Sequence, residues 1–223
     1  SKTGSADLLE ELGFNLEMEP EDTVAMVREV GFGFFFAPRY HPAMRHAGPV
    51  RSSLGIRTVF NFLGPLTNPA GASRLSVGTS DSRMAGLMVD VLRNRGAERA
   101  FVFYGEDGLD ELTTTGPSFI YRLRNGEVTT AEFTPEDFGV RRASIEDLKG
   151  GSVDENAAIL RAILDGRPGP KRDIAIVNAA PAIVVSGLAD GFVEAVELAA
   201  EAIDTGDAQA VLDRALTFTR ERA

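Results

Sequence analysis

The sequence predicts an α/β protein with a central mixed β-sheet flanked by helices. Three observations point to this fold class: strand-like apolar runs alternate with amphipathic helical patterns, an Asn-Gly pair joins two alternating runs, and the last third is helical. The 223 residues are 43% hydrophobic, an ordinary value for a packed core. No repeat, low-complexity tract or linker divides the chain, so we expect one α/β domain over residues 1–223.

The first predicted elements are two helices and a strand. The loop "SKTGSAD" opens onto the helix "LLEELG", with Asp7 as its N-cap and Gly13 at its end. A second helix, "MEPEDTVAMVREVG", has Pro20 in its first turn and ends at Gly31. The apolar run "FGFFFAP", stopped by Pro38, is predicted to be a buried strand. The residues after it would then lie past the carboxyl end of a strand, where open α/β sheets bind ligands.

The middle and end of the chain continue the alternation. We expect a helix from Pro42 to Leu54, and a short helix from "TVFNFL" that ends at the tight Gly-Pro loop of "GPLTNP". "RLSVGTS" and "RAFVFYG" are predicted strands on either side of the helix "SRMAGLMVDVLRNRG". Asn125-Gly126 joins "SFIYRLR" to "EVTTAEF" as an antiparallel hairpin. Four helices follow: "DENAAILRAILDG", "DIAIVNAAPAIVVSG", "GFVEAVELAAEAIDTG" and "AQAVLDRALTFTRER".

Composition and charge exclude several classes of protein. The absence of cysteine removes disulfides, thiolate zinc sites and a cysteine nucleophile, and with two histidines we expect no transition-metal cluster. A net charge of -10 disfavours binding to nucleic acid or to anionic lipid. No run of eighteen apolar residues and no signal-peptide pattern is present, so we expect a cytoplasmic protein. An anionic small substrate stays possible, because four arginines are close in sequence: Arg39, Arg45, Arg51 and Arg57.

Three stretches carry side chains that suit chemistry, and each has a plainer alternative. "SKTGSAD" could cradle a phosphate at a helix N-terminus, or be an ordinary helix cap. "GEDGLDELTTTG" could hold Mg²⁺ through its adjacent carboxylates, or be a solvated acidic loop. "HPAMRHAGPVR" could bind a carboxylate or phosphate, or be the charged face of an amphipathic helix. From the residues alone we infer an anion-binding α/β protein, with Mg²⁺ as a candidate cofactor.

Four motifs, in their order and spacing, resemble the anthranilate phosphoribosyltransferase family over essentially the whole chain: "KTGSADLLEELG", "HPAMRHAGPVRSSLGIRTVFNFLGPLTNP", "GEDGLDELTTTG" and "NAAPAIVVSG". The second and third are the specific ones, since pyrimidine nucleoside phosphorylases of the same fold carry a loop like the first. The resemblance implies transfer of the phosphoribosyl group from 5-phosphoribosyl diphosphate to anthranilate, in tryptophan biosynthesis. Mg²⁺ would neutralise the leaving diphosphate, and no covalent nucleophile would be needed.

The resemblance also implies roles for individual residues. The arginine of "PVR", Arg51, would face the anthranilate carboxylate, and His41, Gly64 and Pro65 would line the path of the aromatic substrate. The consecutive acids Asp110 and Glu111 would hold Mg²⁺, and the hydroxyls of Ser1 and Thr3 would approach the phosphoribosyl diphosphate. Met44 stands where some family members have an aromatic residue, and the resemblance gives Arg39, Arg45, His46 and Arg57 no task.

The largest departure from the family is at the N-terminus. Members begin with a small helical domain, which makes the contact of their homodimer, and then carry a "GTGGD" phosphate loop and a "KHGNR" segment; this sequence contains none of these. We therefore expect the chain to correspond to the C-terminal two-thirds of such an enzyme and to be inactive, or nearly so, by itself. The alternatives are a pyrimidine nucleoside phosphorylase, a nucleic-acid-binding paralogue of the same fold, and a fragment that keeps only the fold.

Overall fold

The computed structural model describes residues 3–41 and 60–222. The chain forms two compact units. The helical unit combines Ser1–Thr58, Gly150–Gly166 and Ile203–Ala223, and the sheet unit combines Val59–Lys149 and Arg167–Ala202. Each unit is therefore assembled from segments that are far apart in the sequence.

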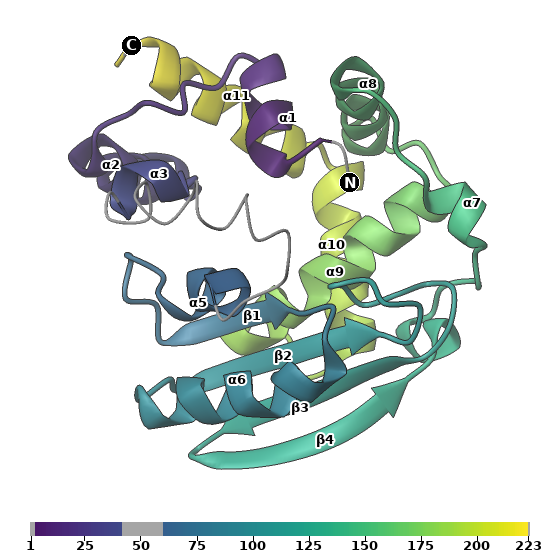
Figure 1. Ribbon diagram of the computed structural model, residues 1–223. Coiled ribbons are helices and arrows are strands. Elements are labelled where there is room, and N and C mark those ends of the chain that lie inside the picture. Colours follow the sequence, from purple (N-terminus) through teal and green to yellow (C-terminus); the bar gives the residue numbers. More distant parts are fainter. Residues whose placement is uncertain (1–2, 42–59, 223) are drawn as a thin grey trace, which may run out of the picture. The chain divides into compact units, whose positions relative to one another are not determined.

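The sheet unit is built on a four-stranded mixed sheet in the order β1-β2-β3-β4 (Figure 1). The strands are β1 (Arg74–Gly78), β2 (Arg99–Gly105), β3 (Ser118–Arg124) and β4 (Glu127–Phe133). β1 and β2 are parallel, and the other two neighbouring pairs are antiparallel. The mixed sheet flanked by helices confirms the predicted fold class.

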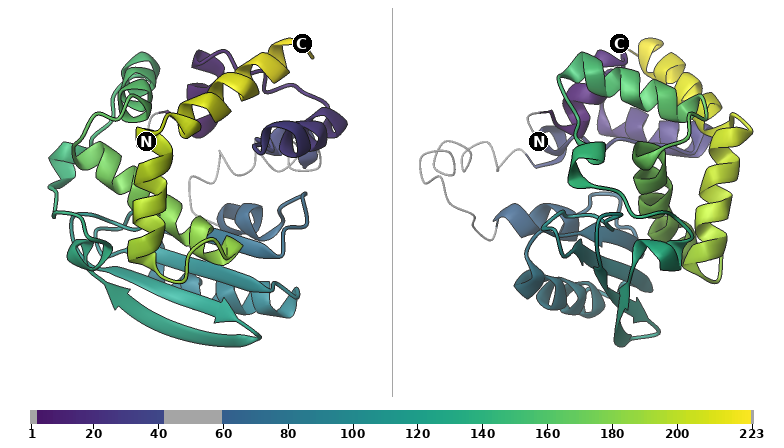
Figure 2. Two further views of the ribbon diagram at one scale, coloured as in Figure 1. Left: turned by 180° about the vertical axis from the view of Figure 1, so that it is seen from behind. Right: turned by 90° about the vertical axis from the view of Figure 1, so that its right-hand side faces the viewer.

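Helices cover both faces of the sheet, as Figures 1 and 2 show. The helix α6 (Ser82–Asn94) packs on one face, where Met88 and Val89 meet Val77, Val102 and Leu123 of the strands. On the other face α9 (Pro170–Ser186) contacts β1 and β2. The Phe192 ring, at the start of α10 (Phe192–Asp204), lies 5.2 Å from that of Phe101. β2 is buried along most of its length because it is enclosed on both faces.

The hairpin and the predicted helices of the sheet unit are confirmed. Asn125 and Gly126 have φ angles of 53° and 80°, the left-handed values that a tight two-residue turn requires. Gly96 and Gly187 follow α6 and α9 with φ angles of 81° and 88°. Two short elements that the sequence did not predict lie between the hairpin and the helices that follow it: η1 (Pro135–Phe138) and α7 (Ile145–Leu148).

The described part of the helical unit contains α1 (Ser5–Glu11), α2 (Pro20–Val30), α3 (Ala37–Tyr40), α8 (Val153–Leu164) and α11 (Asp207–Arg220). α1 packs against α8, and α2 packs against α11. One core cluster joins Phe14 and Met26 to Ala215 and Phe218, so residues from both ends of the chain share it. The predicted helices at α2, α8 and α11 are confirmed.

Two predictions for the helical unit are wrong. Residues 32–36 form no strand, and none of the described strands pairs with them; Phe32 and Phe34 instead pack edge-on against Phe14, at 6.2 and 6.4 Å. Their apolar side chains are therefore half-buried against the core cluster of the helical unit rather than against a sheet. Asp7 is not the N-cap of α1: Gly4 is, and the Asp7 carboxylate accepts the N–H of Gly4 at 2.8 Å from the third helical position.

The Gly-Pro segment also differs from its prediction. The helix α5 (Phe60–Leu66) runs through Gly64 and Pro65, where a tight loop was expected. The helix ends one residue later, where the Thr67 N–H bonds to the Gly64 carbonyl at 3.2 Å and the Thr67 hydroxyl to the Leu63 carbonyl at 2.8 Å. The predicted helix from Pro42 to Leu54 lies outside the described residues.

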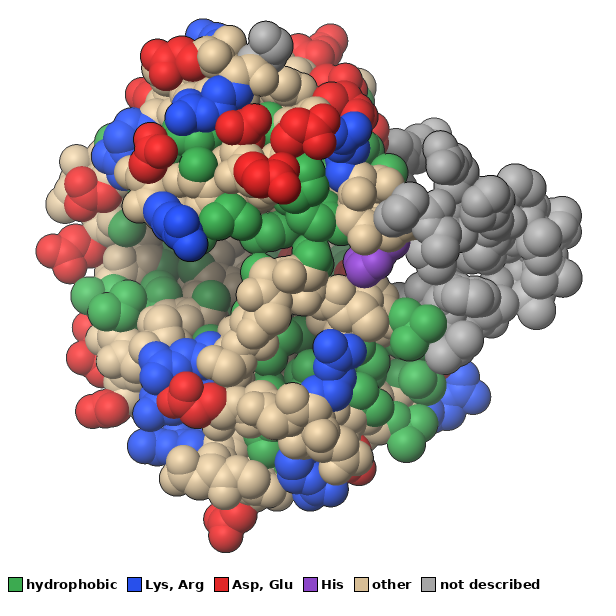
Figure 3. Space-filling view, turned by 90° about the vertical axis from the view of Figure 1, so that its left-hand side faces the viewer, with side chains coloured by type: hydrophobic (Ala, Val, Ile, Leu, Met, Phe, Trp, Pro, Cys, Tyr) green, Lys and Arg blue, Asp and Glu red, His purple; other side chains and the backbone are tan. Residues whose placement is uncertain are grey.

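The described residues include no helix long and apolar enough to cross a membrane. On the face that Figure 3 displays, acidic and basic side chains are interspersed. A wide basic surface, of the kind that nucleic-acid binding needs, is not formed by the described side chains on that face.

Candidate functional site

The acidic motif forms a loop at the carboxyl end of β2. This acidic loop, residues 106–117, joins β2 to β3. Its base is closed by two backbone hydrogen bonds: the Gly105 N–H donates to the Leu109 carbonyl at 3.1 Å, and the Glu106 N–H donates to the Pro117 carbonyl at 2.9 Å. Because β1 runs parallel to β2, the carboxyl ends of both strands lie at this edge. It is the edge at which open α/β sheets bind ligands.

Asp107 holds the acidic loop in shape. One of its carboxylate oxygens, Oδ2, accepts the hydroxyls of Thr113 at 2.5 Å and Thr115 at 2.7 Å. The other, Oδ1, accepts the N–H of Leu109 at 3.1 Å. Both oxygens are thus engaged within the loop, so Asp107 has a structural role in it.

Asn178 of α9 ties the acidic loop to the helix beneath the sheet. Its Oδ1 accepts the N–H of Leu112 at 2.8 Å, and its Nδ2 donates to the carbonyl of the same residue at 2.8 Å. Nδ2 also donates to the Ile174 carbonyl, one turn earlier in α9, at 3.0 Å. Leu112 is fully buried, so its backbone groups have to be satisfied by the protein.

Asp110 and Glu111 are both exposed when the whole residue is considered, but protein atoms surround part of the Glu111 carboxyl group. Partial burial of the Glu111 carboxyl raises its pKa above the usual range, and the charges of Asp110 and Asp107 raise it further. A divalent cation between Asp110 and Glu111 would relieve this repulsion. The two carboxylates are hard oxygen ligands of the type that Mg²⁺ takes, so the donor set fits the ion.

Among the described side chains no group of three or more His, Asp or Glu converges on one point. Mg²⁺ sites of enzymes that act on phosphates use one or two carboxylates, with waters and substrate oxygens as the remaining ligands. The Asp110–Glu111 pair therefore suits an ion that is shared with a phosphorylated ligand rather than one enclosed by protein.

A cavity of about 320 Å³ lies along the outer edge of β1. Its wall includes Pro65 of α5, and Gly78 at the end of β1 also lines it. The carbonyl of Asp110 lies directly against Gly78. Pro65 and the end of β1 therefore line one cavity, and the acidic loop touches β1 at Gly78.

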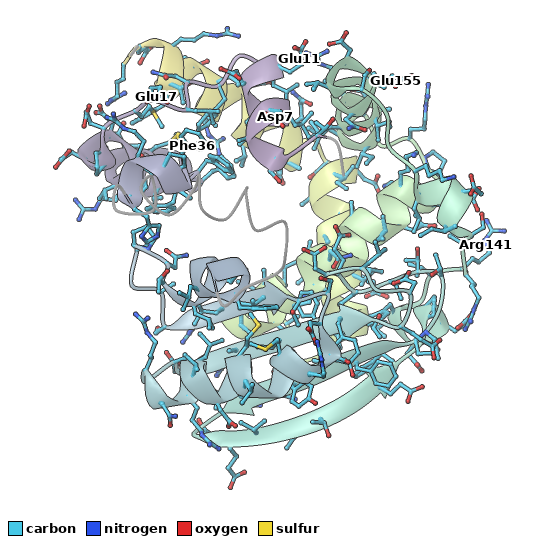
Figure 4. All side chains as sticks on the ribbon, in the orientation of Figure 1. Asp7, Glu11, Glu17, Phe36, Arg141 and Glu155 are labelled. Atoms are coloured by element: carbon cyan, nitrogen blue, oxygen red, sulfur yellow. The ribbon has the colours of Figure 1, made fainter. Side chains whose placement is uncertain are left out.

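Two predicted site residues lie in the helical unit. The Thr3 hydroxyl is 3.5 Å from the carbonyl of Gly151, which immediately precedes the N-cap of α8. His41 follows α3 as its C-cap, and its N–H donates to the Ala37 carbonyl at 2.9 Å. Figure 4 shows Asp7 and Glu11 on α1 and Glu155 on α8, the helices that adjoin the Thr3 loop.

Arg39 has a structural partner. It forms an ion pair with Glu19, and its Nη1 lies 3.8 Å from Glu17, both in the loop that leads into α2. This arginine is therefore engaged on the surface of the helical unit. Ser1, Met44, Arg45, His46, Arg51 and Arg57 lie outside the described residues.

The sequence did not predict the residues that hold the acidic loop. Asp107, Asp110 and Glu111 share one short motif, and nothing in their spacing separates the structural acid from the other two. For Asn178 a signal existed, because an amide in the apolar stretch "DIAIVNAAPAIVVSG" needs a polar partner. That partner is 66 residues away, and only the fold identifies it.

Comparison with curated proteins shows similarity over the whole chain. The anthranilate phosphoribosyltransferase of Solibacter usitatus is 50% identical over 222 residues, which is 100% of this chain and 65% of that protein. The one from Parvibaculum lavamentivorans is 47% identical over 219 residues, 98% of this chain and 64% of that protein. The chain thus spans about 65% of the length of the curated relatives it matches.

Solved structures give the same result. Anthranilate phosphoribosyltransferase from Thermus thermophilus superimposes with a TM-score of 0.91 at 44% identity, covering 97% of this chain and 64% of that chain. The Saccharomyces cerevisiae enzyme in complex with PRPP and Mg superimposes with a TM-score of 0.89 at 26% identity, covering 98% of this chain and 63% of that chain.

A comparison with profiles of protein families agrees with the fold and with these similarities. The profile described as "Glycosyl transferase family, a/b domain" matches residues 1–209. The chain therefore belongs to this glycosyl transferase family, of which it carries the a/b domain.

Proposed function

We propose that this chain is part of a magnesium-dependent anthranilate phosphoribosyltransferase, which joins anthranilate to 5-phosphoribosyl diphosphate. The observation that carries the proposal is the Asp110–Glu111 pair at the carboxyl edge of β1 and β2, in a chain 50% identical to a curated enzyme of that name. The Saccharomyces cerevisiae relative with this fold has been solved in complex with PRPP and Mg and, in a separate structure, with 4-fluoroanthranilate.

The reaction is a displacement at the anomeric carbon of the ribose. The bond from that carbon to the diphosphate oxygen breaks, a bond to the anthranilate nitrogen forms, and the nitrogen loses one proton. Magnesium, when bound, neutralises the charge on the departing diphosphate. No side chain has to form a covalent bond, so the chain acts by positioning and by electrostatic stabilisation.

Each candidate residue has a role in this proposal. Asp110 and Glu111 would hold the metal, whose positive charge would compensate both the two carboxylates and the diphosphate. Arg51 would bind the anthranilate carboxylate, since a guanidinium matches a carboxylate with two parallel hydrogen bonds. The remaining candidates would bind the two substrates: His41, Gly64 and Pro65 the anthranilate ring, and Ser1 and Thr3 the phosphoribosyl diphosphate.

The metal site is tested by Asp110→Asn and Glu111→Gln in the natural full-length polypeptide. Each neutral variant should lower kcat/KM at least about a hundredfold, because magnesium loses an anionic ligand, and more Mg²⁺ should be needed for half-maximal rate. Phosphorolysis of thymidine or uridine in place of anthranilate transfer would contradict the proposal.

The acceptor site is tested by Arg51→Ala, with Arg39→Ala as the matched control. Loss of the carboxylate partner should raise the KM for anthranilate about tenfold or more and leave the KM for phosphoribosyl diphosphate nearly unchanged. Arg39 is engaged with Glu17 and Glu19, so its removal should leave both KM values unchanged. An equal response to the two variants would remove Arg51 from the proposed site.

The activity of residues 1–223 alone is a separate proposal. We expect these residues to be inactive, or nearly so, because the "GTGGD" and "KHGNR" segments of the resembled family do not occur in them. Turnover of anthranilate by residues 1–223 at the rate of a full-length relative would contradict it. Cytoplasmic location and a homodimeric enzyme also stay predictions, which fractionation and light scattering would test.

A further inference from the structure

We propose that Asn178 is a positioning residue for the Asp110–Glu111 pair, acting through the backbone of Leu112. The inference rests on the proposed function, because it concerns the metal-holding role of that pair. It adds a residue from α9, 66 positions away from Leu112, to a site that the sequence motif confines to one loop.

The two peptide groups that flank Glu111 are both fixed. The group that joins Asp110 to Glu111 carries the Asp110 carbonyl, which lies against Gly78 of β1. The group that joins Glu111 to Leu112 carries the Leu112 N–H, which donates to Asn178 at 2.8 Å. With a peptide plane held on each side, Glu111 has little freedom to rotate about its own backbone bonds.

The contact from Asn178 has the chemistry of a peptide group. Its amide accepts from the Leu112 N–H and donates to the Leu112 carbonyl, both at 2.8 Å, as a neighbouring strand would. The acidic loop has no strand partner at this point among the described residues, and Leu112 is fully buried. At Leu112, the residue that follows the Asp110–Glu111 pair, the two hydrogen bonds to Asn178 therefore take the place of the hydrogen bonds to a neighbouring strand.

The third hydrogen bond of Asn178 explains how the amide is oriented. Nδ2 donates to the Ile174 carbonyl at 3.0 Å, one turn back on the same helix, so both amide hydrogens are engaged. The side chain is thereby held to α9, which packs on β1 and β2. The sheet therefore holds α9, α9 holds Asn178, and Asn178 holds the backbone next to Glu111. All of these contacts lie within the sheet unit.

The test uses Asn178→Ala and Asn178→Ser. The serine hydroxyl can bond to the Ile174 carbonyl in the helix, so that variant releases Leu112 while it keeps α9 satisfied. The matched control is Asn156→Ala, because Asn156 makes the same two-way pair with Gly151, at 3.0 and 3.2 Å, in the helical unit. Thermal melts establish that each variant folds.

Two readouts are measured on residues 1–223. Amide hydrogen exchange at Leu112 should accelerate about tenfold or more in both Asn178 variants, with the strands unchanged. Mn²⁺, a probe for the oxygen ligands of Mg²⁺, is titrated by electron paramagnetic resonance with inorganic diphosphate present, and its dissociation constant for the protein should rise about fivefold or more in both Asn178 variants. Asn156→Ala should leave the Mn²⁺ dissociation constant unchanged.

The outcomes separate the two proposals. If the natural sequence binds no Mn²⁺ with inorganic diphosphate present, or if Asp110→Asn and Glu111→Gln leave that binding unchanged, the metal-holding role fails and the positioning role fails with it. If those two variants lose Mn²⁺ while Asn178→Ser binds it normally with Leu112 released, only the positioning role is overturned. Weaker Mn²⁺ binding with unaltered exchange at Leu112 would overturn it as well.

Discussion

The carbonyl of Asp110 lies against the Cα of Gly78, so close that a Cβ at position 78 would overlap the carbonyl oxygen and carbon. Gly78 is the last residue of β1, and its cross-strand neighbour in β2 is Phe103. The acidic loop therefore folds over the end of β1 only because residue 78 has no side chain. The glycine at position 78 thus allows the backbone of Asp110 to lie against the end of β1.

Gly78→Ala should destabilise the protein by about 1–3 kcal/mol, since either the acidic loop or the end of β1 has to move. The matched control is Gly86→Ala in α6, where the new methyl would sit at ordinary contact distances, the nearest 3.6 Å from the Tyr121 ring. That variant should gain about 0.5–1 kcal/mol, because alanine favours a helix interior. Urea unfolding measures both, and an unaltered stability for Gly78→Ala would refute the close approach.

Asp107→Ala should cost about 1.5–3 kcal/mol, because three hydrogen bonds to one carboxylate are lost and the Thr113 hydroxyl is left buried. Asp107→Asn should cost less, since the amide keeps an oxygen for the Leu109 N–H and can donate to the threonine hydroxyls. Chemical denaturation separates these cases. If the two variants lose the same stability, the negative charge of Asp107 matters and its hydrogen-bond geometry does not.

The hairpin turn gives a prediction about the fold alone. Gly126→Ala should destabilise by about 1–2 kcal/mol, because a side chain is strained at a φ of 80°. Asn125→Gly should change stability by less than about 1 kcal/mol, since glycine readily adopts the φ of 53° found there. Thermal unfolding of both variants tests the turn, and the reverse ranking would contradict it.

The features that could be predicted from the sequence are those that residues close together in the chain determine. The hairpin follows from Asn125 and Gly126, and the end of α2 follows from Gly31, because left-handed backbone angles select these residue types. The amphipathic helices follow from their own periodicity. The failures required knowledge of distant partners: Phe32 and Phe34 look like a strand in sequence, but they pack half-buried against Phe14 in the helical unit.

The candidate site divides in the same way. Its residue types were readable, because adjacent carboxylates in a glycine-flanked loop are a candidate for Mg²⁺, with a solvated acidic loop as the alternative, and the magnesium site stays a prediction. The supports of the loop were not readable, because Gly78 and Asn178 lie far from it in the sequence and reach it only in the folded chain. Likewise, the structural role of Asp107 depends on Thr113 and Thr115 turning back toward it, which spacing alone does not reveal.

The raised pKa of Glu111 predicts how stability depends on pH. Below the usual glutamate value of 4.5 the carboxyl is protonated in both the folded and the unfolded chain. As pH rises, the unfolded chain loses its proton first, so ionisation of Glu111 lowers the free energy of unfolding until the raised folded-state pKa is passed. Glu111→Gln carries no such charge, so it should match the natural sequence near pH 4 and exceed it in stability at pH 7.

Urea unfolding from pH 4 to pH 8 measures this difference, and Glu136→Gln is the control of opposite sign. Arg142 lowers the pKa of Glu136, so that carboxylate contributes stability above its usual range and loses it as pH falls. Glu136→Gln should therefore be the less stable protein at pH 7, with the deficit shrinking in acid. Mg²⁺ should stabilise the natural sequence at pH 7 but not Glu111→Gln. If the stability of Glu111→Gln and that of the natural sequence change with pH in parallel, the acidic loop does not raise the pKa of Glu111.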